Sequence, residues 1–185
     1  MVKPSCLRSA FALICCSHVA AAVTVDFDAL ASGTAIGDQY VADGVRFLGV
    51  FSVANETYGG ALTVPSPPNW AAVGDGTQTL QFVDSSLRIA TTDSIALETP
   101  AVSNGCFDGI ELRAFDAQRN LVDTATTPAF TSSGSKTTTT VSGAGIHYLR
   151  MTRIISGCVA PFDNLVFAAV TVSDTIFFDD FDDFQ

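Results

Sequence analysis

The sequence has few of the residues on which most catalytic sites depend. It contains two histidines and three glutamates, and it lacks the G-x-S-x-G, H-E-x-x-H, phosphate-loop and G-x-G-x-x-G patterns. Nucleotide chemistry therefore has no anchor, and the closely spaced acidic pattern of jelly-roll glycosidases is missing. After residue 22 the only histidine is His147, which lies in a strand pattern and is expected to be a packing or surface residue. We expect no catalytic residues.

Helical periodicity and positive charge are also scarce. No stretch after residue 22 sustains a period of 3.6 residues, so the chain is expected to contain no long helix. The sequence has 9 Lys+Arg against 19 Asp+Glu, and two of the cations, Lys3 and Arg8, precede residue 22. So acidic a surface repels phosphates, which disfavours nucleic acid and anionic membranes as partners. It suits solubility and divalent cations.

The first 22 residues have the order of a secretory signal peptide. Lys3 and Arg8 begin it, the apolar run 10–16 follows, and Ala20-Ala21-Ala22 supplies the small residues of a cleavage site. The apolar run is too short to span a membrane. We therefore expect a secreted protein, extracellular or periplasmic, without a transmembrane anchor. The expected division is a signal peptide at 1–22, a β-sandwich domain at 23–170 and a tail at 171–185.

Two cysteines, Cys106 and Cys158, remain after the leader. An even pair in an oxidising compartment usually forms a disulfide, and neither cysteine has C-x-x-C spacing. A bridge between them would stabilise the fold by roughly 4 kcal/mol on the chain-entropy estimate. The alternative is two separate buried thiols.

Apolar residues recur with period two along most of the chain, which predicts half-buried strands. Residues 108–126 read as two strands joined by a polar turn, and are therefore expected to form a hairpin. The other expected strands lie at 23–28, 45–47, 80–82, 95–97, 137–141, 146–152 and 162–167. Eight or more short strands with Gly, Asn, Asp and Ser between them predict an all-β fold, an antiparallel β-sandwich resembling a jelly roll.

Two segments interrupt this rhythm. Residues 52–78, rich in Pro and Gly, are expected to form a long loop with one or two short strands. The tail ends in Phe177–Gln185, where four aspartates alternate with phenylalanines. Such a segment is a poor core strand, so we interpret it as an appended peptide that an export or assembly receptor recognises.

Acidic residues near both ends of the expected sandwich favour a cation site. Asp26 and Asp28 share one face of the first expected strand, while Asp163 and Asn164 lie in the last. Carboxylate and amide oxygens are ligands that Ca²⁺ prefers. If the first and last strands meet, these four residues can share one structural calcium ion. The alternative is a set of solvated aspartates on an acidic surface.

The long loop contains Trp70, the only tryptophan. It follows a Pro-Pro-Asn turn, so an exposed indole there is expected to stack on a sugar ring, with Asn69, Tyr58 and Asp75 as further ligand-binding residues. The competing interpretation is that Trp70 packs against an open end of the sandwich. Exposure of Trp70 beside Asn69 would favour a binding module, and burial would favour a purely structural protein.

Three segments together resemble exported bacterial β-sandwich proteins, including those that carry PEP-CTERM sorting tails. These are the opening order of 25–47, the pairing of 112–116 with 120–122, and Phe162-Asp163-Asn164-Leu165-Val166-Phe167. The resemblance implies a jelly roll of the carbohydrate-binding-module type, usually non-catalytic. It also implies a structural calcium that bridges the first and last strands at Asp26, Asp28 and Asp163. The tail departs from the pattern because it lacks the Pro-Glu-Pro signal, apolar helix and basic end of a sorting anchor.

These observations predict a secreted, non-catalytic β-sandwich module that binds a polysaccharide or cell-surface glycan, or that interacts with extracellular matrix. One alternative is a purely structural surface protein without a small ligand. The other is a polysaccharide hydrolase or lyase, which a cleft with Glu98 or Glu111 facing a second carboxylate would favour.

Overall fold

A computed structural model of the protein describes residues 21–55, 62–102, 107–127, 136–155 and 157–172. Within these ranges the chain forms two antiparallel β-sheets, a small pair of strands and one 3-10 turn, η1 (Val41–Asp43). The predicted all-β sandwich is confirmed. No helix in the described ranges has the length and apolar character needed to cross a membrane.

The larger sheet has seven strands, in the order β11-β7-β13-β5-β3, with β1 paired to β13 and β14 paired to β7. Their bounds are β1 (Ala22–Val25), β3 (Phe51–Asn55), β5 (Asn69–Val73), β7 (Ala90–Thr99), β11 (Thr137–Ile146), β13 (Ala160–Ala168) and β14 (Thr171–Val172). The first strand therefore lies against the long strand near the end of the chain, with Val25 opposite Leu165.

The smaller sheet has five strands, in the order β10-β9-β12-β6-β2. Their bounds are β2 (Val45–Leu48), β6 (Thr77–Phe82), β9 (Ile110–Phe115), β10 (Leu121–Thr126) and β12 (Tyr148–Arg153). Two short strands, β4 (Leu62–Thr63) and β8 (Ala101–Val102), pair separately.

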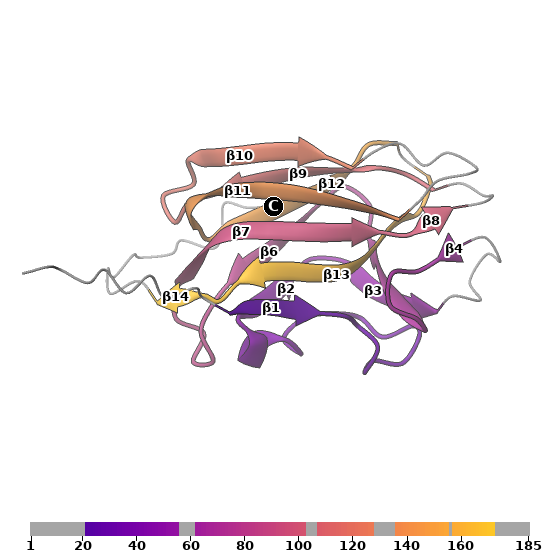
Figure 1. Ribbon diagram of the computed structural model, residues 1–185, viewed down its shortest axis with the longest axis horizontal. Helices are drawn as coiled ribbons and strands as arrows, with labels where there is room; N and C mark the ends of the chain where they lie inside the picture. Colours follow the sequence, from indigo (N-terminus) through magenta and orange to yellow (C-terminus); the bar gives the residue numbers. More distant parts are fainter. Residues whose placement is uncertain (1–20, 56–61, 103–106, 128–135, 156, 173–185) are drawn as a thin grey trace, which may run out of the picture.

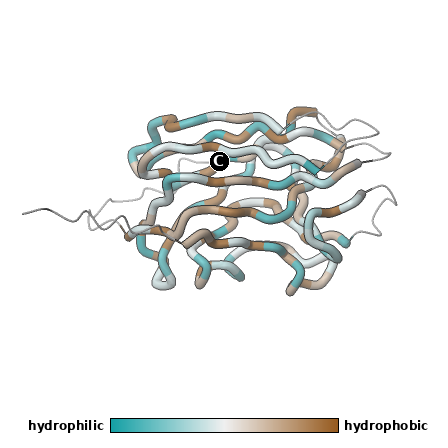
Figure 2. Tube along the Cα trace, viewed as in Figure 1, coloured by the Kyte–Doolittle hydropathy of each residue, from teal (hydrophilic) through white to brown (hydrophobic). Residues whose placement is uncertain are grey.

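The two sheets face each other across an apolar core. In Figure 1, β7, β13 and β1 lie in front, and β6 and β2 lie behind them. Apolar and polar residues alternate along many strands (Figure 2), so that one side of each strand enters the core. Leu80, Leu97, Leu112, Leu149 and Leu165 are all fully buried.

Aromatic rings fill one part of the core. Phe27 packs edge-to-face on Phe162 with the ring centroids 5.4 Å apart, and Phe47 packs in the same way on Phe51 at 5.1 Å. Edge-to-face pairs add about 0.5–1.5 kcal/mol each beyond the area that they bury. Phe27 also packs edge-to-face on Phe47 at 6.0 Å, so the turn after β1 contacts strands of both sheets.

The predicted hairpin at 108–126 is confirmed. Strands β9 and β10 pair in antiparallel fashion, and Leu121 lies opposite Phe115. In the turn, the Asp116 carboxylate accepts hydrogen bonds from the backbone N–H groups of Gln118 and Asn120 at 2.9 and 2.8 Å. Such bonds are the reason that Asp favours turns.

The predicted strand at 146–152 is wrong in one respect, because the chain crosses between the sheets at His147. β11 ends at Ile146 in the larger sheet, and β12 begins at Tyr148 in the smaller one. His147 is fully buried; its Nδ1 lies 2.7 Å from the Ala90 carbonyl oxygen and its Nε2 lies 3.3 Å from the Gln81 amide. The expectation that His147 is a packing residue is therefore confirmed.

The predicted long loop at 52–78 also needs correction. It contains most of β3 and all of β5, and β5 lies inside the larger sheet between β13 and β3. Ala71 and Val73 enter the core, while Trp70 is buried on the opposite side of the same strand. A strand covered on both faces shows no polar alternation, which explains why the sequence pattern did not predict it.

At the end of the described chain, Thr171 and Val172 of β14 pair with Thr91 and Ala90 of β7. The sheet thus continues slightly past residue 170, the expected boundary. Residues 173–185 of the tail lie outside the described ranges, as do residues 1–20 of the expected leader.

Candidate functional site

Two aspartates lie where the first strand ends. The predicted strand at 23–28 stops at Val25, and Asp26 and Asp28 lie in the turn that follows, where the Asp28 N–H donates to Asp26 Oδ1 at 3.2 Å. Phe27 between them has a φ of 64°, which is uncommon for a residue with a side chain. This conformation accompanies a fully buried Phe27 ring flanked by an exposed Asp26 and a half-buried Asp28.

A β-bulge in β13 positions the other two candidates. The register against β7 shifts between Asp163 and Leu165, and Asn164 at the shift has a φ of 41°. Bulges of this kind redirect side chains and are frequent beside functional sites. Asn164 donates through Nδ2 to Glu98 Oε2 at 2.8 Å, and its Oδ1 accepts from the Ser66 hydroxyl at 3.0 Å.

Asp163 is completely buried. Its Oδ2 accepts hydrogen bonds from the Ser66 N–H at 2.7 Å and the Ser66 hydroxyl at 3.0 Å, and its Oδ1 accepts from the Asn164 N–H at 2.8 Å. Within the described residues no lysine or arginine forms an ion pair with it. Burial, together with the negative charge of Asp28, raises the pKa of Asp163 to about 6, although these hydrogen bonds act in the opposite direction.

Tyr40 lies beside the same aspartates. Burial, followed by the negative charges of Asp26, Asp43 and Asp28, raises the pKa of Tyr40 to about 12. Its buried hydroxyl lacks a well-formed hydrogen bond in the part of the chain that the structure describes.

The candidate calcium ligands are therefore partly assembled. Pairing of β1 with β13 brings the turn that holds Asp26 and Asp28 to the strand that holds Asp163 and Asn164. Asp28 Oδ1 also accepts a hydrogen bond from the Asn69 N–H at 3.1 Å. Among the described residues no three Asp, Glu, His or Cys side chains converge closely enough to hold a metal ion. Neutral oxygens would have to complete a set of six to eight ligands.

The predicted sugar-binding role of Trp70 is wrong. The indole exposes no surface, and its Nε1 donates to the Asn55 carbonyl at 3.0 Å across the β3–β5 pair. Asn69 is also buried, and its amide donates to the carbonyl oxygens of Asp28 and Leu30 at 3.3 and 2.9 Å. A hollow of about 320 Å³ is lined by residues that include Trp70, Ser32 and Arg153, but the ring offers no open face in it. Packing, the alternative considered from the sequence, is the role that this geometry supports.

Of the other two members of that predicted set, the structure describes only Asp75. Asp75 lies beyond the far end of β5, where its carboxylate forms an ion pair with Arg153. Tyr58 lies outside the described residues. The structure therefore does not bring Asp75 to Trp70 and Asn69.

The predicted disulfide involves one residue outside the described ranges, Cys106. The residues that follow the two cysteines are close, because Phe107 and Val159 form an isolated parallel β-bridge. The Asp108 N–H donates to the Val159 carbonyl at 2.8 Å. These contacts favour the pairing of Cys106 with Cys158, which stays a prediction.

The outer face of the five-stranded sheet is a site that the sequence pattern did not identify. Strand register aligns its outward-facing side chains in three rows, and the outermost of these, Thr126, Glu111, Thr152 and Thr77, lies beside the two described next. One row consists of Leu121, Phe115, Tyr148, Gln81 and Arg46, and the other of Thr124, Arg113, Arg150, Thr79 and Leu48. We call these ten residues the arginine face. Only knowledge of which strands are neighbours, and in which register, can place them together.

Planar groups gather on the arginine face. The Arg150 guanidinium lies 6.0 Å from the centre of the Phe115 ring, at the outer limit of a cation–π contact. Arg113 is exposed and Phe115 is half-buried, whereas Tyr148 and Gln81 are 5% and 4% exposed. The accessible part of the face is thus formed by arginines, neutral polar residues and the apolar Phe115, Leu121 and Leu48, of which Leu121 is 49% exposed.

The two glutamates considered for catalysis lie on different sheets. Glu98 is in β7 of the larger sheet and is hydrogen-bonded to Asn164, whereas Glu111 is in β9 of the smaller sheet. They do not face each other, and the acidic residue opposite Glu98 in the β7–β13 register is Asp163, which is buried.

No family model and no curated protein matches the sequence. Solved structures with some similarity include a CBM6 module of Clostridium stercorarium in complex with cellobiose (14% identity, 78% of this chain and 92% of that chain, TM-score 0.34). A cleaved adhesin domain of Lys-gingipain has 14% identity over 80% of this chain and 88% of that chain, with a TM-score of 0.38. An arabinose-bound α-L-arabinofuranosidase has 10% identity and a TM-score of 0.38; the match covers 78% of this chain but only 25% of the enzyme. At these values the likenesses carry no argument about ligand or activity.

Proposed function

We propose that this chain is an exported, non-catalytic β-sandwich module that binds a glycan on the arginine face. The leader-like residues 1–22 support export. The observation that carries the binding proposal is the alignment of Phe115, Arg113 and Arg150 on neighbouring strands by the β9–β12 register.

Each of these groups suits a sugar. A ring face offers apolar surface to the C–H side of a pyranose, and guanidinium groups and amides donate hydrogen bonds to its hydroxyls. Because neighbouring strands hold the backbone of these residues, binding does not require the ordering of a loop, which favours recognition. Thr79 and Thr124 on the same rows add hydroxyl groups.

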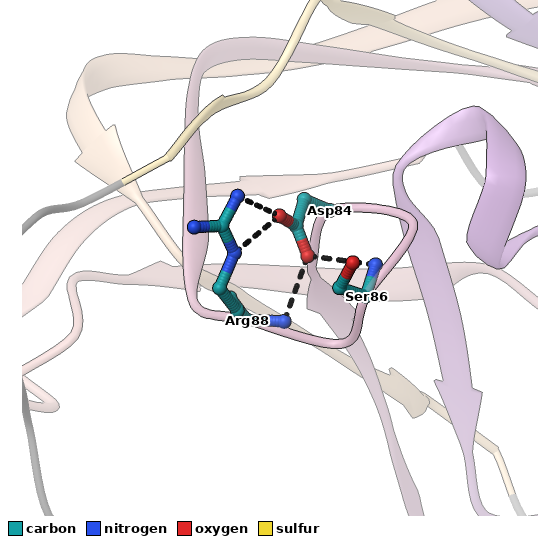
Figure 3. A network of polar contacts seen from close by, with 3 residues as sticks. All are labelled: Asp84, Ser86 and Arg88. Atoms are coloured by element: carbon teal, nitrogen blue, oxygen red, sulfur yellow. Dashed lines mark hydrogen bonds and ion pairs between the residues drawn. The ribbon is translucent and has the colours of Figure 1, made fainter.

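Binding of residues 23–185 to a panel of soluble polysaccharides, measured by affinity electrophoresis, tests this function. The double variant Phe115→Ala/Arg113→Ala should weaken binding at least tenfold. The control is Arg88→Ala, which lies in the turn between β6 and β7 and pairs with Asp84 there (Figure 3). Equal binding by both variants would exclude the arginine face. Absence of binding to every polysaccharide would favour the purely structural surface protein.

We also propose that Ca²⁺ binds between the ends of the fold, held by Asp28, Asp163 and the side-chain oxygen of Asn164, with Asp26 beside them. The support is electrostatic: Asp163 is buried, the negative charge of Asp28 contributes to its raised pKa, and it forms no ion pair with a lysine or arginine among the described residues. A buried carboxylate in that setting requires either a proton or a cation. When bound, Ca²⁺ would supply the compensating charge.

The calcium proposal is tested by thermal melting with chelator and with added Ca²⁺. A cation that binds only the folded state must raise the melting temperature as its concentration rises. Asp28→Asn keeps an oxygen for the Asn69 N–H and removes a charge, so it should reduce this response. The matched control Asp93→Asn also alters an aspartate that accepts a backbone N–H, that of Gly145, and should keep the response. An identical melting curve with and without Ca²⁺ would refute the proposal.

A further inference from the structure

We infer that the ligand of the arginine face is an acidic polysaccharide, whose sugars carry carboxylates as uronic acids do. This inference rests on the function proposed above and specifies the class of glycan. It comes from the placement of charge on the two outer faces of the sandwich.

Three arginines project from the outward positions of the smaller sheet. Arg113 and Arg150 are direct cross-strand partners in the β9–β12 pair. Arg46 lies in β2, separated from β12 only by β6, which places it roughly 10 Å across the sheet. Like charges directly opposite each other destabilise a sheet. The cost of the Arg113–Arg150 pair is offset if an anion lies over both.

Few carboxylates share this face. Among the outward-facing strand positions of the described sheet, Glu111 is the only acidic residue. Asp123 belongs to β10 but accepts a hydrogen bond from the Ser142 N–H of β11, so it is directed toward the other sheet. Asp38 approaches from a loop and pairs with Arg46 at 2.7 Å.

The outer face of the larger sheet gives the contrast. Its outward positions in β7, β11 and β13 hold small, neutral or acidic residues: Ser94, Ala96, Glu98, Thr138, Thr140, Ser142, Asn164, Val166 and Ala168. Lysine and arginine are absent from these described positions. The chain has 9 Lys+Arg and 19 Asp+Glu, so the three arginines on the smaller sheet form a positively charged area on an otherwise acidic protein.

These arginines can accept a ligand carboxylate. Arg113 is exposed and forms no ion pair or hydrogen bond with the described residues. The Arg46–Asp38 pair is partly exposed, with side-chain exposures of 31% and 60%, and such pairs contribute little, so a ligand can compete with it. Guanidinium groups bind carboxylates in a planar, bidentate manner.

The net negative charge of the protein does not prevent this binding. At physiological ionic strength the Debye length is about 8 Å, so acidic residues on the opposite sheet are largely screened at the arginine face. The local field over the face is set by Arg46, Arg113 and Arg150, with Glu111 and Asp38 nearby. A ligand with regularly spaced carboxylates gains from several of these contacts at once.

The test compares polygalacturonate, alginate and hyaluronate with their methyl-esterified forms, which keep the backbone and lose the charge. Residues 23–185 should bind at least one acidic form at least tenfold more tightly than its ester. Arg113→Glu should abolish the difference. The control Arg88→Glu makes the same change of charge in the β6–β7 turn and should keep the difference in affinity between the acidic form and its ester. Melting curves of both variants establish that they are folded.

The outcomes separate the two proposals. The esters or a neutral polysaccharide could bind as tightly as the acidic forms, and Arg113→Glu could abolish that binding. This result would overturn the acidic ligand but keep the glycan site. Equal binding of the acidic forms and of DNA would overturn the inference by showing simple attraction of anions. Absence of binding to acidic and neutral polysaccharides alike would overturn both proposals.

Discussion

Asp163 should make the metal-free domain less stable as the pH rises from 4 to 7. Burial raises its pKa in the folded state from 3.8 to about 6. The folded state then binds the proton more tightly than the unfolded state. The stabilisation is fully present below the unfolded pKa and is lost as the pH rises through the folded pKa.

The size of this effect follows from the shift. One pKa unit corresponds to about 1.4 kcal/mol, so the loss between pH 4 and 7 is at most ~3 kcal/mol. Asp84 and Asp123 act in the opposite direction, because backbone hydrogen bonds lower the pKa of each. Their stabilisation appears as the pH rises, so the wild-type curve alone does not isolate Asp163.

The variant Asp163→Asn isolates it. The amide retains one acceptor oxygen and does not titrate, whereas the variant keeps Asp84 and Asp123. Urea unfolding of both proteins in metal-free buffer gives the free energy of unfolding from pH 4 to pH 7. The wild-type value minus the variant value should fall by up to ~3 kcal/mol across this range. A difference that is constant, or that increases with pH, would show that Asp163 is not a buried carboxylate with a raised pKa.

Three further predictions concern parts of the chain remote from that measurement. Trp70→Ala should lower the free energy of unfolding by about 3–5 kcal/mol, because it empties a buried site and removes the hydrogen bond to the Asn55 carbonyl; a loss below about 1 kcal/mol in urea titration would contradict the burial of Trp70. Thiol titration of unfolded, unreduced residues 23–185 should find no free thiol, and two reactive thiols would exclude the Cys106–Cys158 disulfide. Deletion of 177–185 should leave the melting temperature nearly unchanged and alter secretion or surface localisation in the native host; a large loss of stability with normal secretion would show that this segment is structural.

The period-two pattern predicted most strands because those strands have one buried and one exposed face. The hairpin at 108–126 was predictable from local signals alone, since Asp116 and Asn120 mark the turn and the flanking residues alternate. The β5 strand was not, because Trp70 and Ala71 lie on opposite faces and both are buried. A continuous apolar run gives no direction to the side chains.

The candidate sites depended on facts that a single sequence does not contain. The calcium prediction required the first and last expected strands to lie side by side, and the β1–β13 pairing fulfils this condition. The β-bulge at Asn164, which buries Asp163, left no recognisable pattern in the sequence. Arg113 and Arg150 are likewise far apart along the chain, and only the β9–β12 register places them opposite each other.

The two candidate sites are expected to have separate roles because the fold keeps them apart. Asp28 and Asp163 lie at the β1–β13 pair of the larger sheet, whereas Arg113 and Arg150 face outward from the smaller one. A packed core about 10 Å thick separates the sheets, and solvent screens charges across the surface at a similar distance. Binding of a cation near Asp28 and Asp163 should therefore raise the stability of the fold, because it compensates the charge of the buried Asp163 carboxylate. The arginine face should act on binding, because Arg46, Arg113 and Arg150 lie together on an outer surface of the sandwich.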